Sequence, residues 1–319
     1  MKGVFLDFDT VSNNDVLTTE LEAVLNPLEI YPVSAPEQIP ARIAEVECLL
    51  TNKVKVTAAL MDAAPNLKLI CLAATGFDNV DTDAARERGI AVCNIAGYCT
   101  AAVAQHVFSL ILTLNQRLDD YRDRMRGGDW SRSPHFTMLD YPIRELSGRT
   151  LGIIGYGELG GGVARLGEAF GMEILIAERP GWKGEIREGR LPVEQVLEQS
   201  DVLSLHCPLS EDTRHLINAD ALKRMPAHAI LINTARGAVV DEQALADALR
   251  QGEIAGAGVD VLSQEPPVDG NPLLDEDVPN LVLTPHIAWA TVEARQRALD
   301  EMAMNVRAFK TGEERNRVV

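Results

Sequence analysis

The sequence predicts an α/β protein with two doubly wound parallel sheets, and three observations lead to that fold class. Short apolar runs alternate with helical patterns along the 319 residues, as in parallel sheets that helices cover on both faces. A chain of this length typically forms two domains. A glycine turn typical of the first βα unit of a dinucleotide-binding domain begins at Gly155, after at least four other βα units. A complete α/β domain is therefore expected to precede it.

Ten apolar runs are predicted to be strands. Four precede the glycine turn, at residues 4–8, 46–51, 69–73 and 90–94. Six belong to the second domain, at residues 152–154, 173–177, 202–206, 229–233, 256–261 and 281–284. Helical patterns separate most of these runs, which favours parallel pairing.

Two long helical patterns are expected to connect the domains. Residues 101–125 are predicted to form a single helix with one buried face. Its apolar positions are Val103, Val107, Leu110, Ile111 and Leu114. Residues 291–309 are predicted to form an amphipathic helix that returns to the first domain. Its apolar positions are Ala294, Ala298, Met302 and Val306.

The segment 127–146 is too long and too aromatic for a simple linker. It contains Trp130, His135, Phe136 and Tyr141 among glycines and prolines. We interpret it as a loop that packs on a second subunit.

Composition argues against several classes of partner. The net charge of −17 argues against nucleic acid and anionic membranes, because both would repel such a surface. The five cysteines show no zinc-binding spacing, so we expect buried free thiols in a reducing compartment and no metal site. The amino terminus resembles a strand more than a signal peptide, and no apolar run approaches the ~18 residues that span a bilayer. We expect a cytoplasmic protein.

The most informative segment, residues 150–178, contains a strand, a glycine turn, a helix, a second strand and an acid. Gly155, Gly157 and Gly160 match the spacing in which one glycine turns the chain, the next admits a pyrophosphate and the third lets helix and strand pack closely. A helix starting near Leu159 would direct its amides at the phosphates. Glu178 lies at the offset of an acid that binds ribose hydroxyls. The segment predicts dinucleotide binding.

Glu178 also bears on the choice between NAD and NADP. Its charge should repel a 2′-phosphate, whereas Arg179 and Lys183 follow closely enough to offer such a phosphate a counterion. The acid's place at the end of the strand favours NAD, with NADP as the alternative.

Three later strand ends carry reactive side chains, at the sheet edge where ligands of doubly wound folds bind. Arg236 offers a planar fork that can bind a substrate carboxylate and polarise an adjacent carbonyl. His286 could pass a proton to the carbonyl oxygen as hydride reaches the carbon. Glu265 could hold that imidazole in one tautomer and favour its protonated form. The other histidines are interpreted as structural: His106, His135, His206, His215 and His228.

Seven motifs in order resemble those of the NAD-dependent D-isomer-specific 2-hydroxyacid dehydrogenases, and they cover almost the whole chain. They are CLAATGFDNVD (71–81), NIAGYCTAAVAQHVFSLIL (94–112), LSGRTLGIIGYGELG (146–160), HCPLSEDTRHLIN (206–218), NTARGAVVDEQAL (233–245), GVDVLSQEPP (258–267) and TPHIAWAT (284–291). The chain is most similar to the glycerate dehydrogenase and hydroxypyruvate reductase branch. The family's arginine, glutamate and histidine fall on Arg236, Glu265 and His286.

The resemblance implies a flavodoxin-like substrate domain, residues 1–98 plus 287–319, and an inserted Rossmann NAD-binding domain, residues 99–286, that closes over a cleft. Asp260 would accept from the nicotinamide carboxamide, and Thr100 would lie near the nicotinamide ribose and phosphate. The substrate carboxylate would meet the backbone amides of Ala74, Thr75 and Gly76. Further cofactor contacts would come from Glu158, Leu159, Arg179, Cys207, Pro208, Thr234, Ala235, Arg236 and His286.

The resemblance also implies the reaction and the assembly. A homodimer would reversibly reduce a small 2-oxo acid by hydride transfer from NADH, with hydroxypyruvate or glyoxylate as the first choice. D-lactate-type, branched 2-oxo acid or phosphite chemistry on the same scaffold stays open. Trp289, one helical turn beyond His286, could wall the substrate pocket or pack at the domain hinge. The family also includes NAD-sensing corepressors, but the complete set of Arg236, Glu265 and His286 favours an enzyme over such a scaffold.

Overall fold

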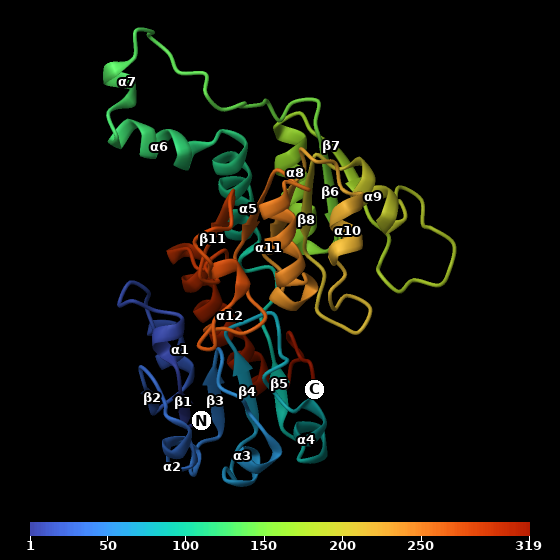
Figure 1. Cartoon of the computed structure of the whole chain (residues 1–319). Helices are drawn as coiled ribbons and strands as arrows, with labels where there is room; N and C mark the ends of the chain where they lie inside the picture. Colours follow the sequence, from blue (N-terminus) through green and yellow to red (C-terminus); the bar gives the residue numbers. More distant parts are fainter. The chain divides into compact units, whose positions relative to one another are not determined.

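The computed structural model describes residues 1–319 and divides them into two compact units. Unit 1 comprises Met1–Cys99 and Ala290–Val319, and unit 2 comprises Thr100–Trp289. Each unit contains one parallel β-sheet with helices packed on it (Figure 1). None of the helices has the length and apolar character that crossing a membrane would require. The roles predicted for the two parts of the chain stay predictions.

Unit 1 has a five-stranded sheet in the order β2-β1-β3-β4-β5, and every neighbouring pair is parallel. The strands are β1 (Gly3–Phe5), β2 (Leu28–Ile30), β3 (Cys48–Thr51), β4 (Leu69–Leu72) and β5 (Ala91–Cys93). This is the flavodoxin-like strand order. The predicted flavodoxin-like fold is therefore confirmed.

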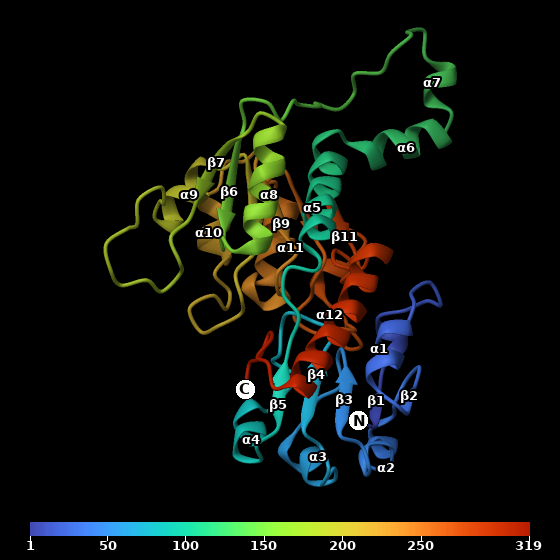
Figure 2. The same ribbon diagram turned by 180° about the vertical axis from the view of Figure 1, so that it is seen from behind.

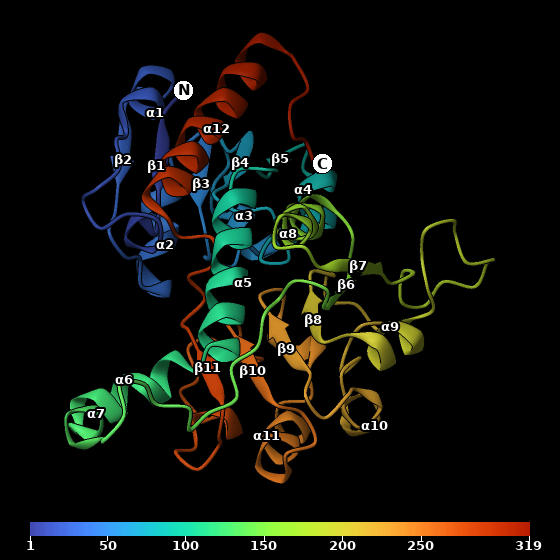
Figure 3. The ribbon, with the colours of Figure 1, turned by 90° about the horizontal axis from the view of Figure 1, so that it is seen from above.

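Helices cover both faces of this sheet. One face carries α2 (Ile39–Ile43), α3 (Ala58–Asp62) and α4 (Thr82–Glu87), and the other carries α1 (Thr19–Val24) and α12 (Val292–Thr311) (Figure 3). Val4, Leu49 and Ile70 belong to the core beneath α2, α3 and α4. Cys71 points to the other side, where its Sγ lies 3.8 Å from the carbonyl oxygen of Met302 in α12. Burial on both faces explains why these strands are continuous apolar runs.

The predicted carboxyl-terminal helix is present as α12. The hydroxyl of Thr291 caps it by accepting a hydrogen bond from the Ala294 N–H at 3.2 Å. Its four predicted apolar positions are all buried. Beyond the helix, the Val318 N–H donates to the Val92 carbonyl at 2.7 Å, so the end of the chain pairs along β5.

Unit 2 has a six-stranded parallel sheet in the order β11-β10-β9-β8-β6-β7. The strands are β6 (Thr150–Ile154), β7 (Glu173–Ile176), β8 (Val202–Leu205), β9 (Ile230–Asn233), β10 (Gly256–Val259) and β11 (Leu281–Leu283). A single parallel bridge joins Ala177 to Leu191 beyond β7. With that bridge counted as a reduced third strand, the order is that of the Rossmann fold, and it reverses between β6 and β8. The predicted Rossmann fold is confirmed.

Two sets of helices cover this sheet. One face carries α5 (Thr100–Asn115) and α8 (Glu158–Ala169), and the other carries α9 (Val193–Gln199), α10 (Ala219–Arg224) and α11 (Glu242–Gln251) (Figure 3). The helices lie very close to the strands. A Cβ on Gly258 of β10 would come within 2.9 Å of Leu110 of α5, and one on Gly152 of β6 would come within 2.7 Å of Val196 of α9.

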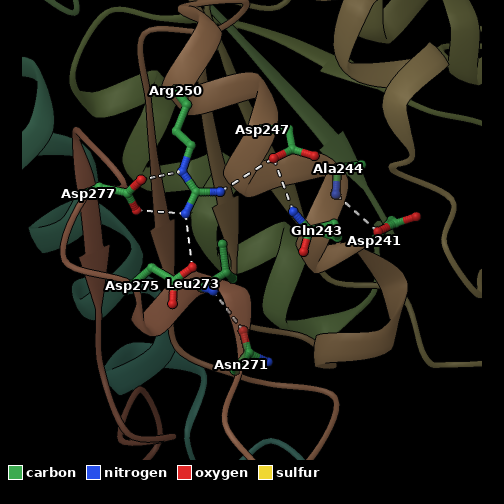
Figure 4. A network of polar contacts seen from close by, with 9 residues as sticks. All are labelled: Asp241, Gln243, Ala244, Asp247, Arg250, Asn271, Leu273, Asp275 and Asp277. Atoms are coloured by element: carbon green, nitrogen blue, oxygen red, sulfur yellow. Dashed lines mark hydrogen bonds and ion pairs between the residues drawn. The ribbon is translucent and has the colours of Figure 1, made fainter.

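A polar network fixes the approach to β11. Arg250 of α11 donates to Asp275 at 2.9 Å and to both carboxylate oxygens of Asp277 at 2.7 and 3.0 Å (Figure 4). Asp247, one turn earlier on α11, lies 3.4 Å from the same guanidinium. These ion pairs tie the loop before β11 to a helix that packs on the sheet. They help to place the strand that leads to His286.

The prediction of one helix over 101–125 is wrong. α5 ends at Asn115, and a separate helix, α6 (Leu118–Arg126), follows. Arg117, between them, adopts a left-handed backbone conformation with φ of 54°, and its Nε donates to the Asp120 carboxylate at 2.6 Å. Left-handed backbone interrupts the helical hydrogen-bond ladder. All of α5 belongs to unit 2.

The segment after α5 extends away from the sheet of unit 2 (Figure 2). It contains α6, a four-residue helix α7 (Asp129–Arg132) and an irregular stretch. Several of its apolar side chains are exposed: Trp130, Phe136, Leu139 and Ile143. We call residues 118–145 the arm.

All ten predicted strands are present, most of them a residue or two shorter than expected. β2 was not predicted. It has three residues, Leu28–Ile30, all partly exposed at the edge of the sheet. Such a segment is too short to show a pattern in the sequence.

Candidate active site

Three neighbouring strands of unit 2 end in the residues predicted to carry the chemistry. β9, β10 and β11 are adjacent and parallel, so their carboxyl ends lie at one edge of the sheet. Arg236 follows β9, Glu265 follows β10 and His286 follows β11. In open α/β sheets this edge is the usual ligand-binding edge.

The structure brings Glu265 and His286 into direct contact. Their Oε2 and Nδ1 atoms are 2.6 Å apart. The other oxygen of Glu265 accepts from the Leu262 N–H at 2.8 Å, which fixes the carboxylate. Because a carboxylate can only accept, Nδ1 is the protonated atom of this pair and Nε2 faces away from it. About a quarter of the His286 side chain is exposed, so the ring can be reached by a ligand.

Asp260 shapes the turn that carries His286. This aspartate is 1% exposed, and its carboxylate accepts from the backbone N–H groups of Ile287 at 2.9 Å and Ala288 at 2.8 Å. The Thr284 hydroxyl donates to it at 2.5 Å. The His286 N–H donates to the backbone carbonyl of Asp260 at 2.8 Å. The side chain and the backbone carbonyl of Asp260 therefore both hold this turn. The predicted contact of Asp260 with a nicotinamide carboxamide stays a prediction.

His106 extends this network to α5. Its Nε2 lies 3.0 Å from the Thr284 hydroxyl and 3.6 Å from the Asp260 carboxylate. These contacts place His106 beside the turn that carries His286, and its interpretation as structural stays a prediction.

The side chain of Asn233, the last residue of β9, holds the turn that carries Arg236. The Asn233 side chain accepts from the Ala235 N–H at 3.1 Å and donates to the Arg236 carbonyl at 3.1 Å. The next residue, Gly237, lies against the loop that leads to Glu265. A Cβ on Gly237 would lie 1.9 Å from the carbonyl carbon of Leu262. The arginine-bearing and glutamate-bearing loops therefore pack backbone to backbone.

Trp289 lies close to His286. Its indole N–H donates to the His286 carbonyl at 3.0 Å. This bond fixes a large side chain next to the imidazole, and the predicted role of Trp289 as a pocket wall stays a prediction.

The glycine turn after β6 fits a dinucleotide. Gly155 has φ of 98°, and a Cβ on it would lie 2.4 Å from the backbone nitrogen of Cys207. A Cβ on Gly160 would lie 2.3 Å from the Gly155 carbonyl oxygen, so α8 can approach the strand this closely only with glycine there. A Cβ on Gly157 would have no atom within 4 Å. One glycine thus makes the turn, one allows close packing and one leaves the backbone open to a phosphate.

Other predicted cofactor residues surround this turn. The Thr100 hydroxyl donates to Glu158 at 3.2 Å, which places it at the amino terminus of α8. Glu158 and Leu159 are the first two residues of that helix. The carbonyl of Pro208, beyond β8, accepts from Thr213 at 2.7 Å. The Thr234 hydroxyl oxygen and His206 Nδ1, at the ends of β9 and β8, are buried without a hydrogen-bond partner. Buried polar atoms are almost always paired with protein groups or ordered water, so these two are open to a group bound at this edge of the sheet.

His206 is neutral at physiological pH. Burial lowers the pKa of its imidazole to about 4. Its Nε2 lies 2.8 Å from the Ser204 hydroxyl. His206 is predicted to be structural, and its unpartnered nitrogen lies at the same edge of the sheet as Arg236, Glu265 and His286.

Glu178 lies at the end of β7, as predicted, but it faces Arg187. The Arg187 Nε lies 3.0 and 3.1 Å from its two carboxylate oxygens, and a second guanidinium nitrogen also contacts it. The backbone N–H groups of Arg179 and Arg187 donate to it at 2.7 and 3.1 Å. Arg187 lowers the pKa of this carboxyl to about 2. Arg179 and Lys183 are the cations expected near this acid from the sequence, whereas its partner in the structure is Arg187.

The predicted substrate turn, Ala74 to Gly76, belongs to unit 1. The Ala74 carbonyl accepts from the Ile95 N–H at 3.1 Å, and the Thr75 carbonyl accepts from the Asn94 side chain at 2.7 Å. These bonds hold the turn against the end of β5. Its role toward substrate stays a prediction.

Residues 108–288 match the family model described as D-isomer specific 2-hydroxyacid dehydrogenase, NAD binding domain. The chain is also 44% identical to a glycerate dehydrogenase of Methylorubrum extorquens over 99% of this chain and 98% of that protein. The chain belongs to the D-isomer specific 2-hydroxyacid dehydrogenase family. This 2-hydroxyacid dehydrogenase is an oxidoreductase that uses NAD, as predicted.

Two solved structures resemble this dehydrogenase along nearly the whole chain. D-lactate dehydrogenase of Aquifex aeolicus, complexed with NAD and lactic acid, is 32% identical with a TM-score of 0.82, covering 98% of this chain and 96% of that one. An NADPH-dependent glyoxylate/hydroxypyruvate reductase of Sinorhizobium meliloti, in complex with NADP and malonate, is 31% identical with a TM-score of 0.81, covering 100% and 97%. The predicted fold and the predicted enzyme class both agree with these relatives.

Proposed function

We propose that this dehydrogenase reduces a small 2-oxo acid, hydroxypyruvate or glyoxylate first, to the corresponding 2-hydroxy acid. The contact between His286 Nδ1 and Glu265 Oε2 carries the proposal. This contact orients the imidazole of His286 as a proton donor. It lies at the edge of the sheet where β9 leads to Arg236. The names of the related glycerate dehydrogenase and glyoxylate/hydroxypyruvate reductase support this substrate class.

Each residue of the set has a separate task. Arg236 binds the substrate carboxylate with its planar guanidinium and draws electron density from the neighbouring carbonyl. His286 donates the proton on Nε2 to the carbonyl oxygen, because Nδ1 is engaged by Glu265. Glu265 holds the ring in place and stabilises its protonated form. Trp289 limits the room beside the imidazole, which favours a substrate with a small side chain.

The glycine turn, Thr100 and the end of β8 hold the cofactor in this proposal. NADH, when bound, supplies the hydride that reduces the carbonyl carbon. The open backbone at Gly157 and the amino terminus of α8 suit its pyrophosphate. The unpartnered atoms of Thr234 and His206 are available to its polar groups.

A substrate panel tests this proposal. The loss of absorbance at 340 nm would be followed with NADH and, separately, NADPH against hydroxypyruvate, glyoxylate, pyruvate and a branched 2-oxo acid. We expect the highest kcat/KM with one of the first two. A preference for the branched acid would contradict the small pocket assigned to Trp289, and no turnover with any of them would contradict the proposed substrate class.

We further propose that the protein forms a homodimer through the arm. Phe136 and Leu139 are 90% and 83% exposed, and Trp130 and Ile143 of the same arm are exposed as well. Exposed apolar side chains that gather in one segment are typical of an interface, whereas single ones are ordinary. Wild type should sediment as a dimer, and the double variant Phe136→Asp/Leu139→Asp should sediment as a monomer. Val268 is 76% exposed on a different loop, so Val268→Asp serves as the control. A wild-type protein that sediments as a monomer would contradict the proposal.

We place the protein in the cytoplasm. All five cysteines are free and buried, which suits a reducing compartment. A protein purified from its native source with any of these thiols in a disulfide would contradict this.

A further inference from the structure

The end of β7 carries an acid whose charge is already neutralised. Glu178 has 3% of its side chain exposed, whereas Arg187 has 47%. Both carboxylate oxygens accept from Arg187, and one of them also accepts from the Arg179 N–H. Few lone pairs remain for a ribose hydroxyl. In its usual role, an acid at this position accepts from the ribose and repels a 2′-phosphate.

The contacts around Arg187 hold it in this position. Its guanidinium lies 5.0 Å from the centre of the Trp182 ring, a distance at which a cation and an aromatic ring attract. The Trp182 indole N–H donates to the Glu185 carbonyl at 2.9 Å, which fixes the ring. With the pKa of Glu178 lowered to about 2, the pair stays ionised and neutral overall at physiological pH.

The segment that follows β7 is basic, although the chain as a whole is strongly acidic. Residues 178–190 contain four cations, Arg179, Lys183, Arg187 and Arg190, and three acids, Glu178, Glu185 and Glu188. Four positive and three negative charges give this segment a net charge of +1 in a chain of −17. A 2′-phosphate here would meet a locally positive surface.

We propose that Arg187 determines cofactor choice by neutralising Glu178, so that the enzyme accepts NADPH as well as NADH. The inference rests on the proposed function only in taking this edge of the sheet as the cofactor site. Arg187 acts through Glu178 and is a positioning residue. With the arginine in place, the acid neither repels the 2′-phosphate nor binds the ribose diol strongly. Without it, the acid is free to do both.

Binding of each cofactor tests this directly. Quenching of tryptophan fluorescence would give Kd values for NADH and for NADPH in wild type, Arg187→Ala and Arg187→Lys. We expect wild type to bind NADPH within about tenfold of NADH. Arg187→Ala should weaken NADPH relative to NADH by about tenfold or more, because a like charge then faces the phosphate. Arg187→Lys should fall between them, since lysine keeps the charge without the planar fork.

A double variant separates neutralisation from direct contact with the phosphate. If Arg187 acts through Glu178, adding Glu178→Gln to Arg187→Ala removes the unpaired charge and restores NADPH binding. If the restoration fails, Arg187 contacts the phosphate itself and the proposed route is wrong. Arg224→Ala is the matched control, because it removes an arginine that pairs with Glu198 at 3.1 Å and has similar exposure. Its NADPH to NADH ratio should equal that of wild type.

Three results would overturn the inference. Wild type could bind NADPH more than about a hundredfold more weakly than NADH, Arg187→Ala could leave the ratio unchanged, or it could weaken both cofactors equally. The last result would show a purely structural role. Because Kd needs no substrate, a protein that turned over no 2-oxo acid but still showed the predicted shift would refute the proposed substrate class and leave this inference standing.

Discussion

Glu265 and Glu178 both lie at the carboxyl edge of the six-stranded sheet, and their partners differ in kind. Glu265 faces an imidazole at 2.6 Å and about a third of its side chain is exposed. Glu178 faces an arginine, and its side chain is almost fully buried. Imidazole gains and loses a proton near neutral pH, whereas guanidinium keeps its charge. One acid can therefore support proton transfer, and the other can only hold structure or adjust local charge.

A position at the end of a strand therefore indicates that an acid lies near a ligand, but it does not define what that acid does. Each glutamate follows a strand of the same sheet and would be assigned to the site from sequence alone. The partner, contributed by a distant part of the chain in one case and by the next loop in the other, decides the chemistry.

Replacing the proton donor should have the largest effect. We expect His286→Ala to lower kcat by ~10²-fold or more, because general acid catalysis is typically worth that much. NADH binding should persist in fluorescence titration. His228, which pairs with Asp201 at 2.7 Å beside the start of β9, supplies the control, and His228→Ala should keep near wild-type turnover. If His286→Ala turned over at the wild-type rate, His286 would have no part in the reaction and Glu265 would lose its proposed role as well.

Removing the charge of Glu265 should have the next largest effect. Glu265→Gln keeps the size of the side chain but cannot stabilise a protonated ring, so kcat should fall by about tenfold to a hundredfold. Steady-state kinetics with saturating NADH would measure it. Glu198→Gln changes a surface acid of another ion pair and should leave kcat unchanged. A Glu265→Gln enzyme as fast as wild type would make Glu265 as structural as Glu178.

The contact between Glu265 and His286 could be anticipated from the sequence because parallel strands end at one side of the sheet. Once residues 229–233, 256–261 and 281–284 were identified as neighbouring strands, Glu265 and His286 had to follow adjacent ends. The glycine turn was equally predictable, since each glycine has its own steric reason. These features depend on local patterns and on the regular geometry of the sheet.

The features that were missed have no regular pattern in the sequence. Arg187 lies nine residues beyond Glu178 in an irregular loop, and no periodicity marks it as the partner of that acid. The helix break at Arg117 involves neither glycine nor proline, so the apolar pattern appeared continuous to residue 125. The link from His106 to Thr284 joins residues 178 positions apart. Sequence periodicity reports regular helices and strands, and it reports neither an irregular loop, nor a single left-handed residue, nor a contact between distant segments.

A methyl group at Gly237 should disturb the loops of Arg236 and Glu265 together. The added carbon would lie 1.9 Å from Leu262 backbone, and backbone cannot move aside as a flexible side chain can. We expect Gly237→Ala to lower kcat/KM by about tenfold and to destabilise the fold by about 1–3 kcal/mol. Gly161 of α8 is the control, because a Cβ there meets only the end of Arg165 at 3.7 Å. Gly161→Ala should stabilise the protein, by at most about 1 kcal/mol. Urea unfolding measures the free energy of unfolding of both variants. Equal changes in that free energy for Gly237→Ala and Gly161→Ala would contradict this packing.

The smallest effect is expected at His206, which follows β8 in the middle of the same sheet. Its folded-state pKa of about 4 lies below the ordinary value of 6.5, so below pH 6.5 the unfolded chain binds a proton that the folded protein does not. The stability associated with the neutral ring is fully present above pH 6.5 and is lost as the pH falls toward 4, by at most about 1.4 kcal/mol per pH unit. Urea midpoints at pH 8 and pH 5 should therefore differ more for wild type than for His206→Asn. If the urea midpoint changed equally with pH in wild type and in His206→Asn, the imidazole of His206 would be solvated. This edge of the sheet would then be more open to water at the end of β8 than at Glu178.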